Sequence, residues 1–166
     1  MTPTDTVPVS APTTVAVLTT GSTIGTLRAC VALIGGELFA IDLKYVREVF
    51  PVDHLTPVPK MPAVIVGVAN LRGTIMPLVD LRAVLNHNDV NGAQPFAIVV
   101  SHGTQQVGLL LDQVPEIRSL VKSDLLAPPS SQESAARPFL SAMVPLDGRM
   151  AGMVDVPTLL AKVEAS

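Results

Sequence analysis

The fold of this chain is decided at residues 67–82, which read Gly-Val-Ala-Asn-Leu-Arg-Gly-Thr-Ile-Met-Pro-Leu-Val-Asp-Leu-Arg. Two apolar, strand-like runs flank a polar turn, and Asp80 then starts a short segment with a helical pattern. Asn70 and Gly73 suit backbone conformations that most residues avoid, which predicts a tight hairpin connection. Arg72 stands in that turn, where its planar head with five donors is better displayed or clamped than buried in a core.

Short apolar runs broken by turn residues continue over most of the chain. Their Val, Ile and Leu content favours strands, and Gly35-Gly36 and Asp147-Gly148 have the composition of hairpin turns. Because no long helices intervene, the pattern predicts an all-β fold of the sandwich or barrel type. The expected strands are residues 29–34, 37–42, 46–50, 64–71, 74–79, 95–101, 106–111, 113–118, 139–146 and 149–154.

Helical patterns follow strands at only two places, residues 81–85 and 156–162. Asp80 and Asp155 stand immediately before them and are expected to act as N-caps, which accept hydrogen bonds from backbone N–H groups. Two β units, each closed by a helix, are therefore predicted.

Composition divides the chain into a tail and a folded domain. Residues 1–27 contain nine Thr, three Pro and a single charge, so we interpret them as a flexible tail in which only residues 15–18 could pair along a sheet edge. The folded domain is expected at 28–163. Charged residues make up 15% of the chain, against roughly 25% in typical soluble domains, as expected either of a protein that docks to others or of a hydrophobic β domain.

Several function classes are disfavoured by composition. The net charge is −3 and no basic run is present, which argues against nucleic-acid binding. The single cysteine, Cys30, cannot form an internal disulfide and is expected to pack as a small hydrophobe. No apolar run reaches the roughly 20 residues needed to cross a bilayer, and no signal peptide is recognised, so we expect a cytoplasmic protein without direct membrane insertion.

The candidate catalytic groups are four aspartates, each of which follows an apolar pair: Asp42, Asp80, Asp112 and Asp155. Such carboxylates can cluster for acid–base chemistry or Mg²⁺ binding, but their position at strand ends favours capping and turn roles. We expect no catalytic constellation, no metal site and no cofactor.

The other polar and glycine motifs also favour structural roles. Three histidines, His54, His87 and His102, fall in predicted turns without metal-ligand spacing. Gly67 and Gly73 are interpreted as residues that a β turn needs for its backbone geometry, because no helix follows to form a phosphate-binding loop.

An ordered set of segments resembles the CheW family, the adaptors that join chemoreceptors to the histidine kinase CheA in bacteria. The match runs from about residue 28 to about residue 162. Besides residues 67–82, the matching segments are residues 31–42, Val46-Arg47-Glu48-Val49, residues 56–59, residues 107–114, Asp147-Gly148-Arg149 and residues 154–156.

This resemblance implies two small SH3-like β-barrels packed side by side and a non-enzymatic adaptor. One surface would bind the membrane-distal tip of a chemoreceptor, and another would pair with the regulatory domain of CheA. The resemblance places Val46, Glu48, Asn70 and Arg72 at the receptor-binding surface. From the residues alone, Arg72 can equally fix the turn by bonding loop carbonyls, and Glu48 can be a solvated strand residue.

Two rival functions stay open on the sequence. The first is the same adaptor role in a sister pathway that controls type IV pili or gliding. The second is a small β-barrel enzyme or ligand carrier that uses the aspartates. Buried carboxylates clustered around a pocket would favour the second, whereas dispersed, turn-bound aspartates would favour the adaptor.

Overall fold

The computed structural model of the chain describes residues 25–83, 85, 92–128 and 137–165, and these contain ten strands, short 3-10 helices (η) and one α-helix. In chain order the elements are β1 (Thr26–Ile34), β2 (Glu37–Asp42), η2 (Leu43–Tyr45), β3 (Val46–Pro51), β4 (Ile65–Leu71), β5 (Thr74–Val79), η3 (Leu81–Ala83), β6 (Phe96–His102), β7 (Gln105–Leu111), β8 (Glu116–Val121), η4 (Lys122–Asp124), β9 (Leu140–Leu146), β10 (Arg149–Val154) and α2 (Val156–Ala165).

The all-β prediction is confirmed, and most strands lie within two residues of their expected bounds. The exceptions are β8, which starts at Glu116 and not at residue 113, and β1, which starts at Thr26 and not at residue 29. The chain bends directly after β7, and Pro115 lacks an N–H for a strand ladder, so pairing with β1 begins only where Glu116 lies opposite Val31. The β1–β8 pairing extends to Thr26, which lies opposite Val121. β1 therefore begins inside the segment that composition assigned to the tail. Residues 15–18 lie outside the described part of the chain.

The two expected helices differ in kind. After β10, α2 extends to residue 165 and is longer than the pattern at 156–162 predicts. After β5, only Leu81–Ala83 is regular, and it is a 3-10 helix; the backbone N–H of Leu85 then donates to the Leu81 carbonyl at 2.9 Å.

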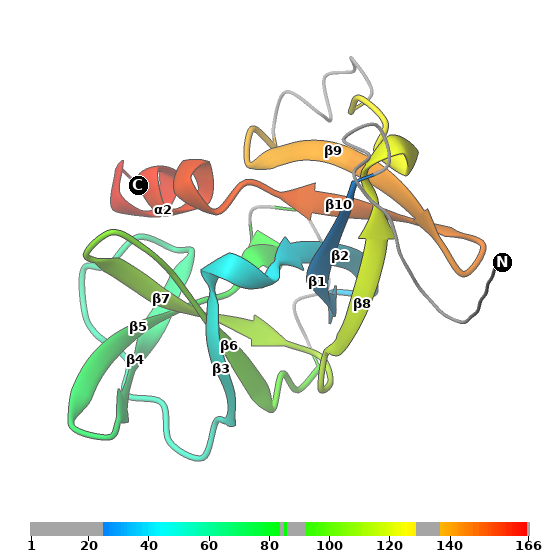
Figure 1. The fold of residues 1–166 in the computed structure, drawn as a ribbon. Helices are drawn as coiled ribbons and strands as arrows, with labels where there is room; N and C mark the ends of the chain where they lie inside the picture. The colour runs from blue at the N-terminus through cyan, green and yellow to red at the C-terminus, as the bar shows by residue number, and fades with distance from the viewer. Residues whose placement is uncertain (1–24, 84, 86–91, 129–136, 166) are drawn as a thin grey trace, which may run out of the picture.

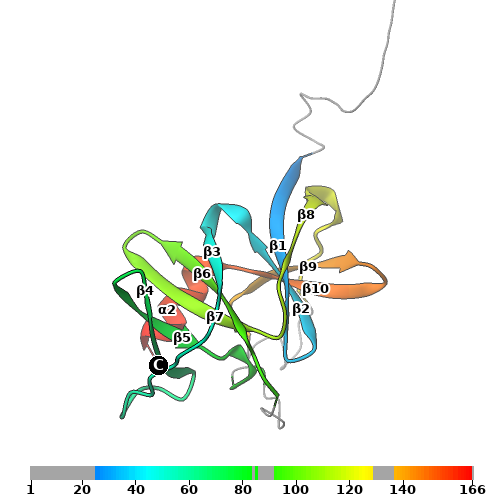
Figure 2. The same cartoon turned by 90° about the horizontal axis from the view of Figure 1, so that it is seen from below.

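The strands form two five-stranded sheets, which each close into a small barrel (Figure 1). Barrel 1 has the order β8-β1-β2-β10-β9, and barrel 2 has the order β3-β6-β7-β5-β4. Reciprocal backbone hydrogen bonds close the rings: Thr56 pairs with Val68 of β4 in barrel 2, and Leu126 pairs with Met143 of β9 in barrel 1. The second view shows the barrels side by side, with α2 against barrel 2 (Figure 2).

The closing bridge of barrel 2 explains Gly67, which lies within β4 and not in a turn. A Cβ on Gly67 would stand 2.5 Å from the Thr56 carbonyl oxygen, closer than real Cβ contacts occur. Glycine is therefore needed here because the closing segment approaches the β4 backbone directly.

The chain is built from two repeats that exchange their first hairpins. The first repeat, β1 to β5, places β1 and β2 in barrel 1 and the other three strands in barrel 2. The second repeat, β6 to β10, does the reverse. Each barrel is therefore a hairpin of one repeat completed by three strands of the other, which explains the mixture of blue and orange strands in barrel 1 (Figure 1).

The registers of the two repeats agree residue by residue along the parallel pairs. Val79 of β5 lies opposite Leu109, and Val154 of β10 lies opposite Ile41. Asp80 and Asp155, which follow Val79 and Val154, are thus structural equivalents. Asp42 and Asp112 are not equivalent. Asp42 directly follows Ile41, whereas two further residues of β7 separate Asp112 from Leu109, the residue that matches Ile41.

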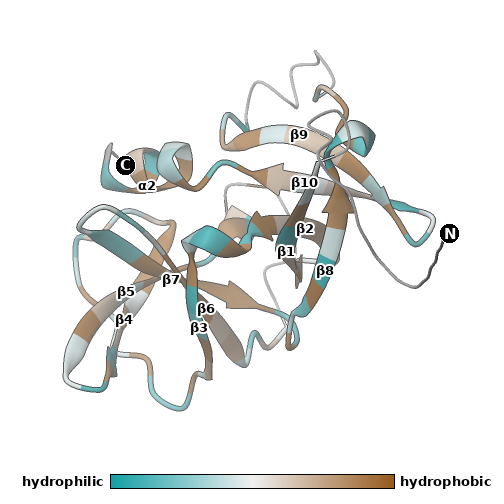
Figure 3. Cartoon of the chain, viewed as in Figure 1, coloured by the Kyte–Doolittle hydropathy of each residue, from teal (hydrophilic) through white to brown (hydrophobic). Residues whose placement is uncertain are grey.

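The largest apolar core lies between the barrels. Along β1, Ala29 and Val31 face the core of barrel 1, while Cys30, Ala32 and Ile34 face the inter-barrel core. The strands β2, β6 and β7 alternate in the same way, and α2 adds Val156, Leu159, Leu160 and Val163 to the inter-barrel core. The four exchanged strands are therefore apolar on both faces, and teal residues gather at turns and at η2 (Figure 3).

Candidate partner-binding surface

The β4–β5 turn is a two-residue connection with both residues in the left-handed region. Arg72 has a φ of 54° and Gly73 a φ of 86°, as a type I′ hairpin turn requires. The sequence predicted an unusual backbone conformation for Asn70 as well, and this is wrong, because Asn70 is not in the left-handed region. Its side-chain Oδ1 instead accepts a hydrogen bond from the Gly73 N–H at 2.9 Å and fixes the turn from outside.

Arg72 reaches from this turn to Glu48 on β3. Nη1 and Nη2 each lie 3.1 Å from one of the two Glu48 carboxylate oxygens, so the pair is bidentate. The Arg72 side chain nevertheless stays 78% exposed, and that of Glu48 30% exposed. The pair joins the tip of the β4–β5 hairpin to β3 at the surface of barrel 2.

A β-bulge decides which face of β3 each candidate occupies. Val46 lies opposite Val100 and Glu48 opposite Val99, so Arg47 is an extra residue between them. The bulge places Val46 on the inter-barrel face, where it packs against the core, and Glu48 on the barrel 2 face. Glu48, Asn70 and Arg72 thus form one surface cluster, while Val46 lies on the opposite face of the same strand.

The equivalent turn of barrel 1 carries the opposite charge, a feature that the sequence reading missed. Asp147 has a φ of 52° and precedes Gly148 at 77°, matching Arg72 and Gly73. Its carboxylate accepts hydrogen bonds from Arg118 on β8 at 2.8 and 3.2 Å. These bonds and the guanidinium charge lower the pKa of Asp147 and raise the pKa of Arg118. The register between the repeats marks Asp147 as the counterpart of Arg72, but it matches Glu48 with Glu116 and so does not identify Arg118 as the partner.

The four aspartates accept hydrogen bonds from different groups. Asp42 accepts the Lys44 N–H at 3.0 Å, and Asp155 accepts the Thr158 N–H at 3.3 Å at the start of α2. Asp112 accepts hydrogen bonds from the Gly35 and Gly36 N–H groups of the β1–β2 turn. No group of three His, Cys, Asp or Glu residues in the described part of the chain is arranged to hold a metal ion.

Asp80 differs from the other three because it is buried. Its Oδ1 accepts the Arg82 N–H at 2.9 Å, and both oxygens accept hydrogen bonds from the Arg82 guanidinium at 2.9 to 3.2 Å. The two side chains are only 10% and 11% exposed. Asp80 therefore combines a cap with a buried, bidentate ion pair.

Replacing Asp155 with Ala should lower the free energy of unfolding by about 0.5–2 kcal/mol, the range for losing an N-cap. The reason is that the Thr158 N–H would lose its acceptor. Urea unfolding followed by circular dichroism measures the change. Asp155→Asn, which keeps a cap oxygen, should cost clearly less, and equal losses for both variants would contradict the capping role.

The two histidines in the described residues belong to different segments. His54 follows β3, and His102 at the end of β6 makes an edge-to-face contact with Tyr45 at 5.9 Å between ring centroids. His87 lies outside the described residues.

Apolar side chains are exposed at matched places on the two barrels. Val49 on β3 lies opposite Ile98, and Ile117 on β8 lies opposite Cys30; both partners belong to the inter-barrel core. Val49 is 36% exposed and Ile117 54% exposed. The two edge strands thus each present an apolar residue on the inter-barrel side, as protein-binding surfaces do.

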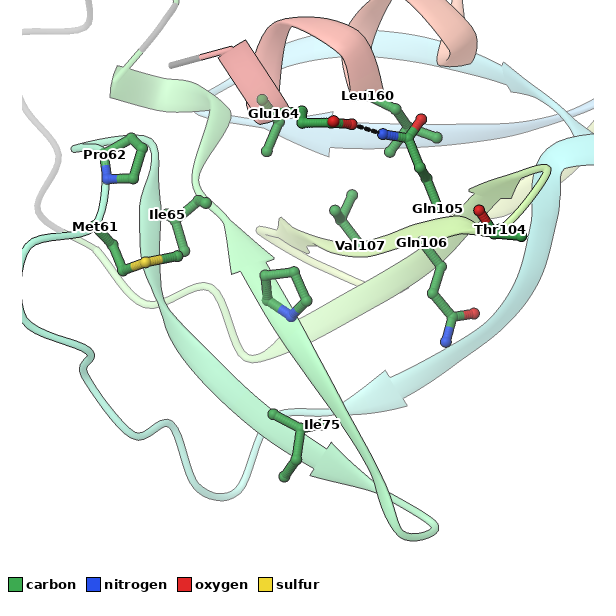
Figure 4. A pocket seen from close by; sticks show the side chains of 12 residues that line it. Met61, Pro62, Ile65, Ile75, Thr104, Gln105, Gln106, Val107, Leu160 and Glu164 are labelled. Atoms are coloured by element: carbon green, nitrogen blue, oxygen red, sulfur yellow. Dashed lines mark hydrogen bonds between the residues drawn. The ribbon is translucent and has the colours of Figure 1, made fainter.

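A pocket of about 580 Å³ opens between the β4–β5 hairpin, the β6–β7 turn and α2 (Figure 4). Met61, Ile65 and Ile75 line one wall, and Leu160 of α2 contributes to the other. Gln105 donates a hydrogen bond to Glu164 at the rim. Ile75 and Met61 are 63% and 39% exposed, so apolar side chains reach the surface of barrel 2 beside the polar part of the lining, which is Thr104, Gln105, Gln106 and Glu164.

These features define a class of protein: a β scaffold of two interlocked barrels that presents ion-paired turns and apolar patches at its surface. The CheW-like domain model matches residues 28–164. The chain therefore belongs to the CheW family, whose members are chemotaxis scaffolds and adaptors.

Individual relatives agree with this assignment. Chemotaxis protein CheW of Klebsiella aerogenes is 31% identical over 145 residues, which cover 87% of each chain. Protein FrzA of Myxococcus xanthus is 29% identical over 111 residues, 66% of this chain and 69% of FrzA. The crystal structure of the scaffolding protein TtCheW from Thermoanaerobacter tengcongensis superposes with a TM-score of 0.69 at 26% identity, covering 78% of this chain and 89% of TtCheW. In the described residues, no helix is long and apolar enough to span a membrane.

Proposed function

We propose that this chain is a cytoplasmic, non-enzymatic adaptor that couples chemoreceptors to the histidine kinase CheA. The observation that carries the proposal is the exposed Arg72 turn. A left-handed backbone costs about 1–2 kcal/mol for a residue with a side chain, and an exposed ion pair returns only about 0–1 kcal/mol. The arginine therefore adds little to folding, and its display supports a role in binding.

The receptor tip is assigned to the Arg72–Glu48–Asn70 cluster and the adjacent inter-barrel side of β3, where Val46 and Val49 lie. The guanidinium supplies planar, charge-assisted donors, and the valines supply apolar area. The regulatory domain of CheA is assigned to the apolar surface around Ile75. Receptor conformations would then bias kinase activity through their different contacts with the adaptor.

Replacing Arg72 with Ala should weaken binding of a receptor cytoplasmic fragment by about 1–3 kcal/mol, the range for a charge-assisted hydrogen bond at an interface. Binding of the CheA regulatory domain should persist. Arg72→Lys should restore only part of the loss, because a point charge cannot reproduce the bidentate fork. Titration calorimetry with each partner measures both affinities.

The matched control is Ile75→Asp, which places a charge in the apolar surface and should weaken kinase binding while leaving receptor binding in place. If Arg72→Ala lowered the affinity for both partners equally and also lowered the melting temperature, Arg72 would serve mainly to hold the turn.

A second candidate is the same adaptor role in a sister pathway controlling gliding or type IV pili, which the similarity to Protein FrzA supports. Affinity capture from the native cell, with identification of the bound kinase and receptor, separates the two. The dispersed aspartates, each hydrogen-bonded to a different group, argue against the enzyme or ligand-carrier alternative.

A further inference from the structure

The chain passes between the barrels at two short crossings. The first, η2, leads from β2 in barrel 1 to β3 in barrel 2. The second, residues 113–115, leads from β7 in barrel 2 back to β8 in barrel 1. Asp112 stands at the start of the second crossing, immediately before the segment that positions β8.

Asp112 binds the tip of the β1–β2 hairpin through its backbone and its side chain. Its N–H donates to the Leu33 carbonyl at 2.9 Å. Its Oδ1 accepts the Gly35 N–H and its Oδ2 accepts the Gly36 N–H, each at 3.1 Å. One carboxylate thus accepts both N–H groups of a turn that lies 77 and 76 residues earlier in the chain, and hydrogen bonds to an ionised acceptor are the strong ones.

Neighbouring groups hold the same turn and the same carboxylate. Gln94, just before β6, donates from Nε2 to Asp112 Oδ1 at 3.1 Å. Arg149 of β10 donates from Nη2 to the Gly36 carbonyl at 2.6 Å. The β1–β2 turn is therefore bound to barrel 1 through the Gly36 carbonyl and to barrel 2 through the N–H groups of Gly35 and Gly36.

The first crossing has no comparable link among the described residues. The carboxylate of Asp42 accepts the Lys44 N–H inside the crossing itself. The contact with the facing β6–β7 hairpin is the ring contact between Tyr45 and His102. Among the described residues, charge-assisted bonds between the barrels lie at the second crossing and at Arg137, which pairs with Glu37 of β2 and donates to the Leu85 carbonyl at 3.2 Å.

We propose that Asp112 is a positioning residue that sets the placement of β8 relative to β3, and with it the spacing of Ile117 and Val49. This inference rests on the proposed function in one respect, that the receptor fragment contacts the inter-barrel side of both strands. A partner that touches barrel 2 alone does not depend on the latch formed by Asp112, Gly35 and Gly36.

The latch is tested first in the unaltered protein by amide hydrogen exchange. The Gly35 and Gly36 amides should exchange about 10- to 100-fold more slowly than the Gly148 amide of the Asp147–Gly148 turn, as hydrogen bonds to a charged acceptor imply. Exchange as fast as that of Gly148 would overturn the proposal without any variant having to fold.

The variant is Asp112→Asn, and the matched control with the same chemical change is Asp42→Asn. The asparagine keeps one acceptor oxygen and turns an NH₂ donor toward the other glycine N–H. Protection at Gly35 and Gly36 should fall in Asp112→Asn only. Residual dipolar couplings should report a changed angle between the barrels in that variant and an unchanged angle in Asp42→Asn.

Receptor-fragment binding by Asp112→Asn should weaken about tenfold, within the usual range of coupling between sites, while the affinity for the kinase regulatory domain stays within about twofold. An unchanged inter-barrel angle, or an equal loss of affinity for the receptor fragment and the kinase regulatory domain, would overturn the positioning role. If the unaltered protein bound no receptor fragment, the proposed function would fail, and the exchange and angle measurements would still decide on the latch.

Discussion

Replacing Asp80 with Ala is expected to lower the free energy of unfolding by about 3–5 kcal/mol, the range for removing one partner of a buried ion pair. The substitution deletes the cap at Arg82 N and the carboxylate that accepts the guanidinium bonds of a side chain only 11% exposed. The sequence predicts only an N-cap role for Asp80, because nothing in the sequence shows that Arg82 folds back into the interior.

Asp155→Ala is the natural comparison, since Asp155 occupies the same register position and serves only as a cap. Urea unfolding of both variants, with Arg82→Ala and the double variant Asp80→Ala/Arg82→Ala, completes a double-mutant cycle. The Arg82 substitution should cost much less when Asp80 is already absent. Similar losses for Asp80→Ala and Asp155→Ala, or additive losses in the cycle, would show that the ion pair contributes little.

Replacing Phe139 with Ala is expected to cost about 3–5 kcal/mol, as for other large-to-small changes of buried aromatic residues. Phe139 is fully buried in the core shared by both barrels, so its removal leaves a cavity against strands of each. The loss should appear in both barrels at once, and unfolding should remain a single transition.

The measurement is urea unfolding followed residue by residue with NMR, using signals from barrel 1 and barrel 2. Ile75→Ala, at a side chain 63% exposed, serves as the surface control and should change stability by less than about 0.5 kcal/mol. Separate midpoints for the two barrels would mean that the shared core does not couple them.

The strands were predictable because their physical signal is local. The runs at β1, β2, β6 and β7 are almost continuously apolar since they are buried on both faces. Asp147-Gly148 and Arg72-Gly73 likewise mark their turns by composition. The predicted start of β8 was wrong because Val114 continues the apolar pattern into residues 113–115. These residues form the crossing between the barrels, which begins after Asp112.

The candidate surface was predictable only in part. Arg72 stands out because an arginine in a hairpin turn is conspicuous, but its pairing with Glu48 depends on barrel closure. The separation of Val46 from Glu48 depends on the single extra residue at Arg47, and a bulge of this kind leaves no mark in an apolar pattern. Arg118 and Asp147 pair across 29 residues, and neither is unusual in its own segment.

The hairpin exchange has a consequence for dissecting the gene. A cut between β5 and β6 would not release two barrels. Each fragment would carry a hairpin of one sheet and three strands of the other sheet. The two fragments would instead have to entwine to fold, as two subunits do in a strand-swapped dimer. The layout is that of an intertwined homodimer with its two protomers joined end to end, except that the matched turns of the two halves carry opposite charges.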